Sequence, residues 1–254
     1  MSPTEVARTY LLPNSPFYRS DLAGFNSPEV DQLRRTLHSQ DEPVQPFAVK
    51  MAELPDKDVK SFMGTMHAMT LPAASGLSEQ PVFRRIDRLL DVAGGSGSLC
   101  IAIASRQPKI RSTIMDIDPV CRIAKENVRS YGLAERITVS PGDMFRDPWP
   151  LGFDGLLFGN IFHDWDLESC RFLACRAFDV LEPGGVISLH EMLLNDRKDG
   201  PLTVACYSIA MLLHEKGKQF TADELKTILT DAGFSNFRVT PTFGYYSLVT
   251  ATKA

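Results

Sequence analysis

The chain has 254 residues, 44% of them hydrophobic, and a formal net charge of −4 at pH 7. This length suits one α/β domain with a short additional segment. The acidic balance argues against nucleic acid or an anionic membrane as the main partner.

The five cysteines are scattered along the sequence, without a C-x-x-C pair or a cluster of cysteine and histidine. This pattern fits reduced thiols in a cytoplasm and speaks against a metal site. The longest apolar run, residues 202–213, is too short to cross a bilayer, and the N-terminus lacks a secretory pattern. We therefore expect a cytoplasmic protein without a membrane segment.

Two regimes of patterning follow one another along the chain. Residues 1–80 carry helical patterns interrupted by prolines, which predict helices at 28–38 and 56–69. From Arg85 onward strand and helix patterns alternate, as a parallel sheet with crossover helices requires. The predicted strands cover residues 89–93, 112–116, 137–140, 155–158, 185–191, 237–242 and 246–252, and the helices between them cover 98–106, 119–131, 167–181, 204–214 and 222–232.

The last two predicted strands are separated only by a short turn near Gly244, so they should be antiparallel. The sequence therefore predicts a Rossmann-like α/β fold with a seven-stranded, mostly parallel sheet, an antiparallel last strand and additional N-terminal helices. We expect an N-terminal helical segment at residues 1–80 and the α/β domain at residues 81–254.

A glycine-rich turn follows the first predicted strand, with the sequence D-V-A-G-G-S-G at residues 91–97. A strand that turns tightly into a helix brings bare backbone close to a ligand at the positive end of the helix. A dinucleotide fingerprint requires Gly or Ala three residues after Gly97, where this chain has Cys100. The pattern D-x-A-x-G-x-G resembles instead the first motif of the class I methyltransferases, which bind S-adenosylmethionine. Asp91, Gly95 and Gly97 are accordingly candidate cofactor-binding residues.

Two later acids fit the same ligand. Asp116 stands about twenty residues beyond the glycines, at the end of an apolar strand, where a carboxylate binds ribose hydroxyls. Asp143 and Met144 follow the third predicted strand, and an acid beside an apolar side chain suits the amino group and flat face of adenine. Each element alone is also compatible with an ordinary turn. Their order and spacing together predict an S-adenosylmethionine site.

The sequence I-F-H-D-W-D-L-E-S-C, residues 161–170, follows the fourth predicted strand. It resembles the His-Asp-Trp motif of the small-molecule O-methyltransferases typified by the caffeic acid and acetylserotonin enzymes. The resemblance extends from about residue 60 to the C-terminus, and less clearly back to Tyr10. His163 lies at the carboxyl end of its strand, where open α/β sheets place ligands.

The resemblance implies a role for several residues. His163 matches the general base that takes the proton of the acceptor hydroxyl, and an imidazole with a pKa near 6.5 is mostly neutral at pH 7. Glu191, at the end of the neighbouring strand, matches the glutamate that orients this base. Met66 and Met211 match methionines that pack on the acceptor ring, and Thr70 matches a ligand of the donor carboxylate. Without the resemblance, His163 would more simply be a capping or core histidine.

Two departures from the family pattern stand out. The family often has a second glutamate in a G-K-E-R-T run, whereas this chain has Gln219, an expected substrate contact that cannot stabilise an imidazolium by charge. The residues before Phe17 resemble only the end of the winged-helix dimerisation domain that relatives carry. We therefore expect residues 1–80 to act as a linker remnant and pocket lid, and any homodimer to be weakened.

The sequence thus predicts an S-adenosylmethionine-dependent O-methyltransferase acting on a hydroxyl of a small aromatic or polyketide-like molecule. A carbon or nitrogen acceptor on the same fold is the nearest alternative. A non-catalytic accessory protein that binds S-adenosylmethionine is another, motivated by Gln219 and by the N-terminal departure. A nicotinamide-dependent dehydrogenase is a third reading, against which Cys100 weighs.

Overall fold

The computed structural model of the chain describes residue 51 and residues 53–254. The helix expected at residues 28–38 and the residues likened to a winged-helix domain lie outside this part. The helices are α5 (Asp56–Ser78), α6 (Ser98–Arg106), α7 (Asp118–Ser130), α8 (Leu167–Val180), α9 (Leu202–His214) and α10 (Ala222–Asp231), with short 3-10 helices η1 (Pro81–Arg84) and η2 (Phe162–Asp164). The strands are β1 (Arg88–Val92), β2 (Arg111–Asp116), β3 (Ile137–Pro141), β4 (Phe153–Gly159), β5 (Leu181–Met192), β6 (Phe234–Phe243) and β7 (Tyr246–Lys253).

Within the described residues the strands form one seven-stranded sheet of order β3-β2-β1-β4-β5-β7-β6. The pairs from β3 to β5 are parallel, and β7 is antiparallel to both of its neighbours. The prediction of a mostly parallel sheet with an antiparallel last strand is confirmed. In this order β1 and β4 are neighbours, so the sheet changes its winding direction between them, where open α/β sheets bind ligands.

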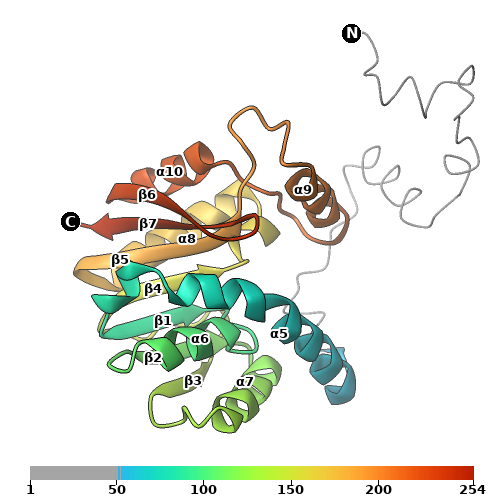
Figure 1. Cartoon of the computed structure of the whole chain (residues 1–254), viewed down its shortest axis with the longest axis vertical. Helices are drawn as coiled ribbons and strands as arrows, with labels where there is room; N and C mark the ends of the chain where they lie inside the picture. Colours follow the sequence, from blue (N-terminus) through green and yellow to red (C-terminus); the bar gives the residue numbers. More distant parts are fainter. Residues whose placement is uncertain (1–50, 52) are drawn as a thin grey trace, which may run out of the picture. The chain divides into compact units, whose positions relative to one another are not determined.

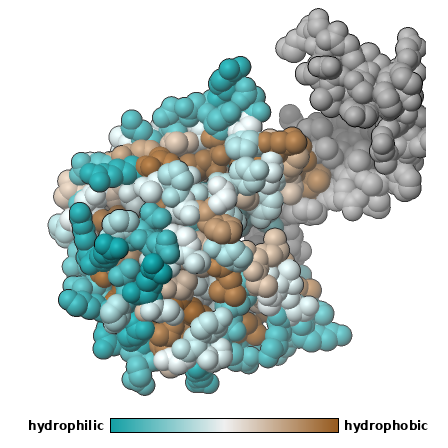
Figure 2. All heavy atoms as spheres, in the orientation of Figure 1, coloured by the Kyte–Doolittle hydropathy of each residue, from teal (hydrophilic) through white to brown (hydrophobic). Residues whose placement is uncertain are grey.

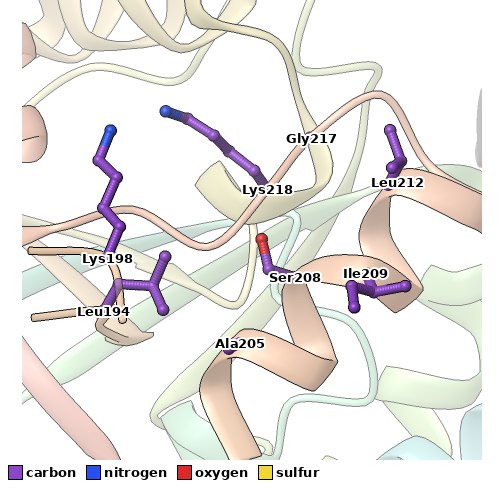
Figure 3. Close-up of a pocket in the computed structure, with 8 residues that line it drawn as sticks. All are labelled: Leu194, Lys198, Ala205, Ser208, Ile209, Leu212, Gly217 and Lys218. Atoms are coloured by element: carbon purple, nitrogen blue, oxygen red, sulfur yellow. The ribbon is translucent and has the colours of Figure 1, made fainter. Parts of the chain in front are cut away.

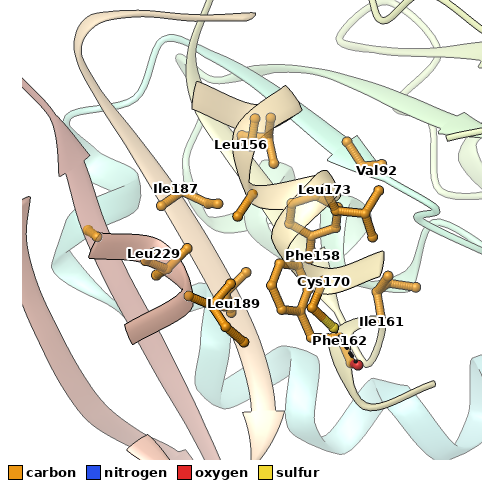
Figure 4. Packing of buried hydrophobic residues seen from close by; sticks show 14 of the residues in the cluster. Val92, Leu156, Phe158, Ile161, Phe162, Cys170, Leu173, Ile187, Leu189 and Leu229 are labelled. Atoms are coloured by element: carbon orange, nitrogen blue, oxygen red, sulfur yellow. Dashed lines mark hydrogen bonds between the residues drawn. The ribbon is translucent and has the colours of Figure 1, made fainter. Parts of the chain in front are cut away.

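Helices cover both faces of the sheet, as Figure 1 shows: α5, α6 and α7 on one face, α8 and α10 on the other. Side chains of β1 are buried on both faces, because Leu90 and Val92 join the core under α8 and α10 while Leu89 joins the opposite core. Two-sided burial is the reason that such strands read as continuous apolar runs. Figure 4 shows Phe158 of β4 and Phe162 of η2 in the first of these cores, with ring centroids 5.1 Å apart.

Helix α5 is longer than the sequence predicted. A helix end was expected at residue 69, ahead of Pro72, yet the helix continues through this proline to Ser78. An internal proline removes one backbone hydrogen bond and usually kinks or ends a helix. Ala74 and Leu77 are fully buried in the core that α5 shares with α6. Burial of this face outweighs the local cost of Pro72.

The surface over α9 is unusually apolar, as the brown area in Figure 2 shows. Leu202 is 78% exposed, and Ile209 and Leu212 on the same helix are also exposed. Among the described residues, no helix is long and apolar enough to cross a membrane.

Candidate active site

The glycine-rich turn has the backbone conformation that its sequence requires. Gly95 and Gly97 have φ angles of +59° and +81°, in the left-handed region that favours glycine. A Cβ at Gly97 would lie 2.8 Å from Cδ1 of Ile114, so close packing also excludes a side chain there. At Gly95 the nearest atom a Cβ would meet is Cε of Met63, at 3.5 Å. The backbone of Gly95 is thus accessible, whereas Gly97 is held against β2.

Asp116 is joined to this turn. Its Oδ2 accepts a hydrogen bond from the Gly95 N–H at 2.8 Å, and its Oδ1 accepts one from the Ile117 N–H at 2.8 Å. Burial raises the pKa of Asp116 to about 6, although the two N–H groups favour the carboxylate. The side chain is half-buried, and its bond to Gly95 places it at the turn.

Asp91 lies deeper. It is fully buried, and no N–H or hydroxyl group among the described residues donates to either carboxylate oxygen. Burial raises its pKa to about 7; the Cys100 thiol opposes the shift, and the charge of Asp116 adds to it. A Cβ at Gly94 would stand 2.7 Å from Asp91 Cγ, so the turn rests directly on this carboxyl group. Asp91 therefore supports the turn from beneath.

The loop after β3 reaches the same edge of the sheet. The Gly142 N–H donates to the carbonyl of Asp116 at 2.8 Å, and Oδ1 of Asp143 accepts from the Phe145 N–H at 2.8 Å. Asp143 and Met144 are half-buried. The Phe145 ring meets Trp165 edge-on, with centroids 4.5 Å apart. This contact joins the loop after β3 to the His-Asp-Trp segment, a link that the sequence prediction missed because Trp165 is distant in the chain.

His163 and Glu191 form a buried pair. Nδ1 of His163 lies 2.8 Å from Oε2 of Glu191, and the two side chains are only 3% and 2% exposed. The second carboxylate oxygen, Oε1, accepts hydrogen bonds from the N–H groups of Ile161 at 3.0 Å and Phe162 at 2.9 Å. Glu191 thus fixes the turn that carries His163 and contacts its ring at the same time.

The second ring nitrogen of His163 also faces a carboxylate, since Nε2 lies 3.2 Å from Oδ1 of Asp164. Burial alone lowers the pKa of His163, but the charges of Glu191 and Asp164 outweigh it and raise the pKa well above its ordinary value. The expectation of a mostly neutral His163 considered one carboxylate partner, whereas the structure places a carboxylate at each ring nitrogen, and both favour the charged form.

The remaining predicted residues lie on α5, on α9 and in the segment that follows α9. Met211 is buried on α9, and Met66 and Thr70 are half-buried on α5. Gln219 is fully buried, and both polar atoms of its side-chain amide lack a hydrogen-bond partner among the described residues. Its backbone N–H donates to Oγ of Ser208 at 3.0 Å. A buried amide without a partner is costly, so this side chain is unusual among the buried polar groups of the described residues.

Sequence reasoning missed two other contacts. Tyr207 on α9 meets the His163 ring edge-on, with centroids 5.6 Å apart. His67 on α5 contacts Oγ of Ser96, within the glycine-rich turn, at 2.9 Å. The signal for His67 was present, because it lies four residues after Met63 and therefore on the same face of α5.

A cavity of about 300 Å³ lies on the outer side of this region, lined by Leu194, Lys198, Ala205, Ser208, Ile209, Leu212, Gly217 and Lys218. Figure 3 shows Ile209 and Leu212 on α9 and the two lysines on the segments that flank it. None of the sequence-predicted site residues lines this cavity. Gly217 connects it to the His163 turn, because a Cβ there would stand 2.0 Å from the His163 carbonyl oxygen. In the described part of the chain, no cluster of three or more His, Cys, Asp or Glu residues could hold a metal ion.

Known proteins resemble this chain over most of its length. A 3-hydroxy-5-methyl-1-naphthoate 3-O-methyltransferase of Streptomyces sahachiroi is 30% identical, over 92% of this chain and 70% of the relative. The acetylserotonin O-methyltransferase of Bos taurus is 31% identical, over 98% and 75%. An O-methyltransferase family 2 protein from Planctomyces limnophilus, solved with apigenin, superimposes with a TM-score of 0.84 at 27% identity, over 99% of this chain and 74% of that one.

The sheet order, the glycine-rich turn and these likenesses define a Rossmann-like methyltransferase. Residues 45–235 match the O-methyltransferase domain family. The chain belongs to this family.

Proposed function

We propose that the protein transfers a methyl group from S-adenosylmethionine to a hydroxyl of a small aromatic secondary metabolite, with His163 as the general base. The observation that carries the proposal is the buried contact between His163 and Glu191 at the carboxyl ends of adjacent strands. Catalytic imidazoles in other enzymes are oriented by a carboxylate in this way. The glycine-rich turn follows β1, and β4 lies between β1 and β5 in the sheet.

The residues at the turn fit the proposed cofactor. The backbone of Gly95 is accessible, and the buried Asp91 and the half-buried Asp116 are carboxyl groups with raised pKa values. A cation bound nearby stabilises their charged forms, and S-adenosylmethionine carries both a sulfonium and an ammonium group. The proposed cofactor-binding residues are Thr70, Asp91, Gly95, Gly97, Asp116, Asp143 and Met144.

When bound, S-adenosylmethionine supplies an electrophilic methyl group on a positively charged sulfur. The protein's own task is to make the acceptor oxygen nucleophilic. A phenol with a pKa near 10 is largely protonated at neutral pH, so transfer of its proton to Nε2 of His163 raises its reactivity. Glu191 then stabilises the imidazolium through Nδ1. Its anchorage to the Ile161 and Phe162 N–H groups keeps the carboxylate from turning away.

The proposed acceptor is an aromatic ring bearing a hydroxyl group. Met66, Met211 and Gln219 are the proposed contacts, since thioethers pack well on rings and the unpartnered Gln219 amide can bind a second polar group. The naphthoate and acetylserotonin relatives are named for O-methylation, which supports this substrate class.

A carbon acceptor is the second candidate. An L-tyrosine C(3)-methyltransferase of Streptomyces lavendulae is 34% identical over 58% of this chain and 41% of its own length. A phenol that loses its proton is also activated at ring carbon, so the same histidine would serve both reactions. The two outcomes differ in the product, because O-methylation consumes the hydroxyl and C-methylation leaves it free.

The test is an acceptor screen with S-adenosylmethionine carrying a ¹³C-labelled methyl group. Hydroxynaphthoates, N-acetylserotonin and tyrosine are suitable probes, and the ¹³C shift of the product separates O-methyl from C-methyl. The proposal expects an O-methyl product with a hydroxyarene, and a loss of turnover in His163→Gln while S-adenosylhomocysteine still binds. Full activity in His163→Gln would contradict the base. Cofactor binding without transfer to any probe would favour the accessory-protein alternative.

A further inference from the structure

The His163 ring has a carboxylate at each nitrogen. Glu191 Oε2 lies 2.8 Å from Nδ1, and Asp164 Oδ1 lies 3.2 Å from Nε2. An opposite charge within about 4–6 Å of a titratable group favours its charged form. Both ring nitrogens of His163 face a carboxylate oxygen within this range, so the geometry favours the imidazolium over the neutral ring.

From this geometry we infer that Asp164 is a positioning residue: it holds His163 as the imidazolium in the ligand-free protein and must leave Nε2 before His163 can act as a base. The second half of this statement rests on the proposed function. The proton balance is simple. The Nε2 proton passes to bulk water as Asp164 leaves. The hydroxyl proton of the acceptor then moves to the same nitrogen while the acceptor oxygen takes the methyl group, whose bond to the donor sulfur breaks.

The two carboxylates differ in a way that decides which of them moves. Glu191 is 2% exposed, and its Oε1 is held by two backbone N–H groups. The Asp164 side chain is 28% exposed, and no hydrogen bond from another described residue holds its carboxylate. The backbone of Asp164 is nevertheless fixed, since its N–H donates to Ile161 at 3.1 Å and its carbonyl accepts from Lys216 at 3.2 Å. Rotation of the Asp164 side chain alone is sufficient to free Nε2.

Two other titratable side chains near this site, on α8 and β7, are neutral at pH 7. Tyr207 on α9 contacts the His163 ring edge-on, Cys170 on α8 donates its thiol to the Phe162 carbonyl at 3.3 Å, and Tyr246 on β7 stacks on His190. Burial raises the pKa of Tyr246 to about 12 and also raises that of the Cys170 thiol, so both are neutral at pH 7. The pKa of His163 is accordingly raised despite its burial.

The inference is tested on the ligand-free protein by ¹⁵N NMR of selectively labelled histidine, with His163→Gln to assign the signal. We expect both ring nitrogens of His163 to be protonated at pH 7.5. Asp164→Asn, which removes the charge and keeps the shape, should lower the midpoint of the titration by about one pH unit or more. The matched control is Asp166→Asn, because Asp166 is the exposed neighbour that caps α8 through the Ser169 N–H at 2.8 Å. A neutral His163 below pH 7, or equal midpoints in the wild type and Asp164→Asn, would overturn the inference.

A second measurement follows the pH profile of kcat/KM. The base must be deprotonated, so the rate should rise with pH through a pKa above the ordinary histidine value. Asp164→Asn should move this rise to lower pH by the same interval as in the NMR titration, whereas a merely structural role would lower the rate equally at every pH. Absence of methyl transfer at any pH would contradict the proposed function and leave the NMR result to decide the role of Asp164.

Discussion

The two halves of the site are built by different means. At the glycine-rich turn, backbone conformation determines the shape of the site, because Gly95 and Gly97 adopt positive φ angles and Asp116 accepts a hydrogen bond from the Gly95 N–H. At the ends of β4 and β5, charged side chains form the site, because carboxylate oxygens lie 2.8 and 3.2 Å from the ring nitrogens of His163. Under the proposed function, the first half binds the methyl donor and the second half transfers the proton. Substitutions in one half should therefore leave the other half largely intact.

The largest expected effect belongs to the charged half. His163→Gln should reduce kcat/KM by roughly 10²- to 10⁴-fold, the usual contribution of a general base. The Kd for S-adenosylhomocysteine, measured by calorimetry, should stay within a few-fold of the wild type because the turn is untouched. A similar loss of affinity for S-adenosylhomocysteine would contradict the idea that the two halves of the site act independently.

The next effect belongs to the turn. Gly95→Val places a β-branched residue at a φ of +59°, a conformation that costs about 1–3 kcal/mol. Relief of this strain displaces the backbone that is proposed to contact the donor, so donor affinity should fall by roughly 10- to 100-fold. The matched control is Gly132→Val, since Gly132 has a φ of +69° and a Cβ there would meet no atom within 4 Å. The control should be destabilised without losing affinity. Equal donor affinity in both variants would show that the turn does not contact the donor.

Glu191→Gln should have a smaller effect on turnover. The amide keeps an oxygen for the Ile161 and Phe162 N–H groups but replaces a charge-assisted contact to His163 by a neutral one, which predicts about a tenfold lower kcat. Glu182→Gln, at an exposed position of the same strand, is the control. If Glu191→Gln were as active as this control, Glu191 would only hold the backbone turn at Ile161 and Phe162 in place.

The smallest expected effect concerns α5. His67→Phe removes the contact with Oγ of Ser96 and should weaken donor binding by about fivefold, the equivalent of one ordinary hydrogen bond. Thr65→Val on the same helix removes a hydroxyl that bonds only within α5, to the carbonyl of Ser61 at 3.1 Å. Calorimetric titration of both variants checks the difference. A change in kcat with unaltered donor affinity in His67→Phe would place α5 in the catalytic half instead.

The same contrast explains what could be predicted from the sequence. The turn is local, so its glycines and the acid at the end of β2 are readable from spacing along the chain. The antiparallel pairing of β6 with β7 also follows from the short turn near Gly244, because a hairpin must be antiparallel, whereas the position of β7 between β5 and β6 is seen only in the fold. These features depend on neighbours in the sequence.

The charge state of His163 could not be predicted in this way. Its two carboxylates come from η2 and β5, and only the fold shows that both reach the ring. The contact between Phe145 and Trp165 likewise joins two loops twenty residues apart. The continuation of α5 past Pro72 depends on burial of Ala74 and Leu77, which local propensity does not reveal.

Calorimetric titration of the chain with S-adenosylmethionine, S-adenosylhomocysteine and NAD tests the central claim most directly. The account predicts that the two sulfur compounds bind and that NAD does not, because the turn and its acids suit a cationic donor. Binding of NAD, or of none of the three, would contradict it.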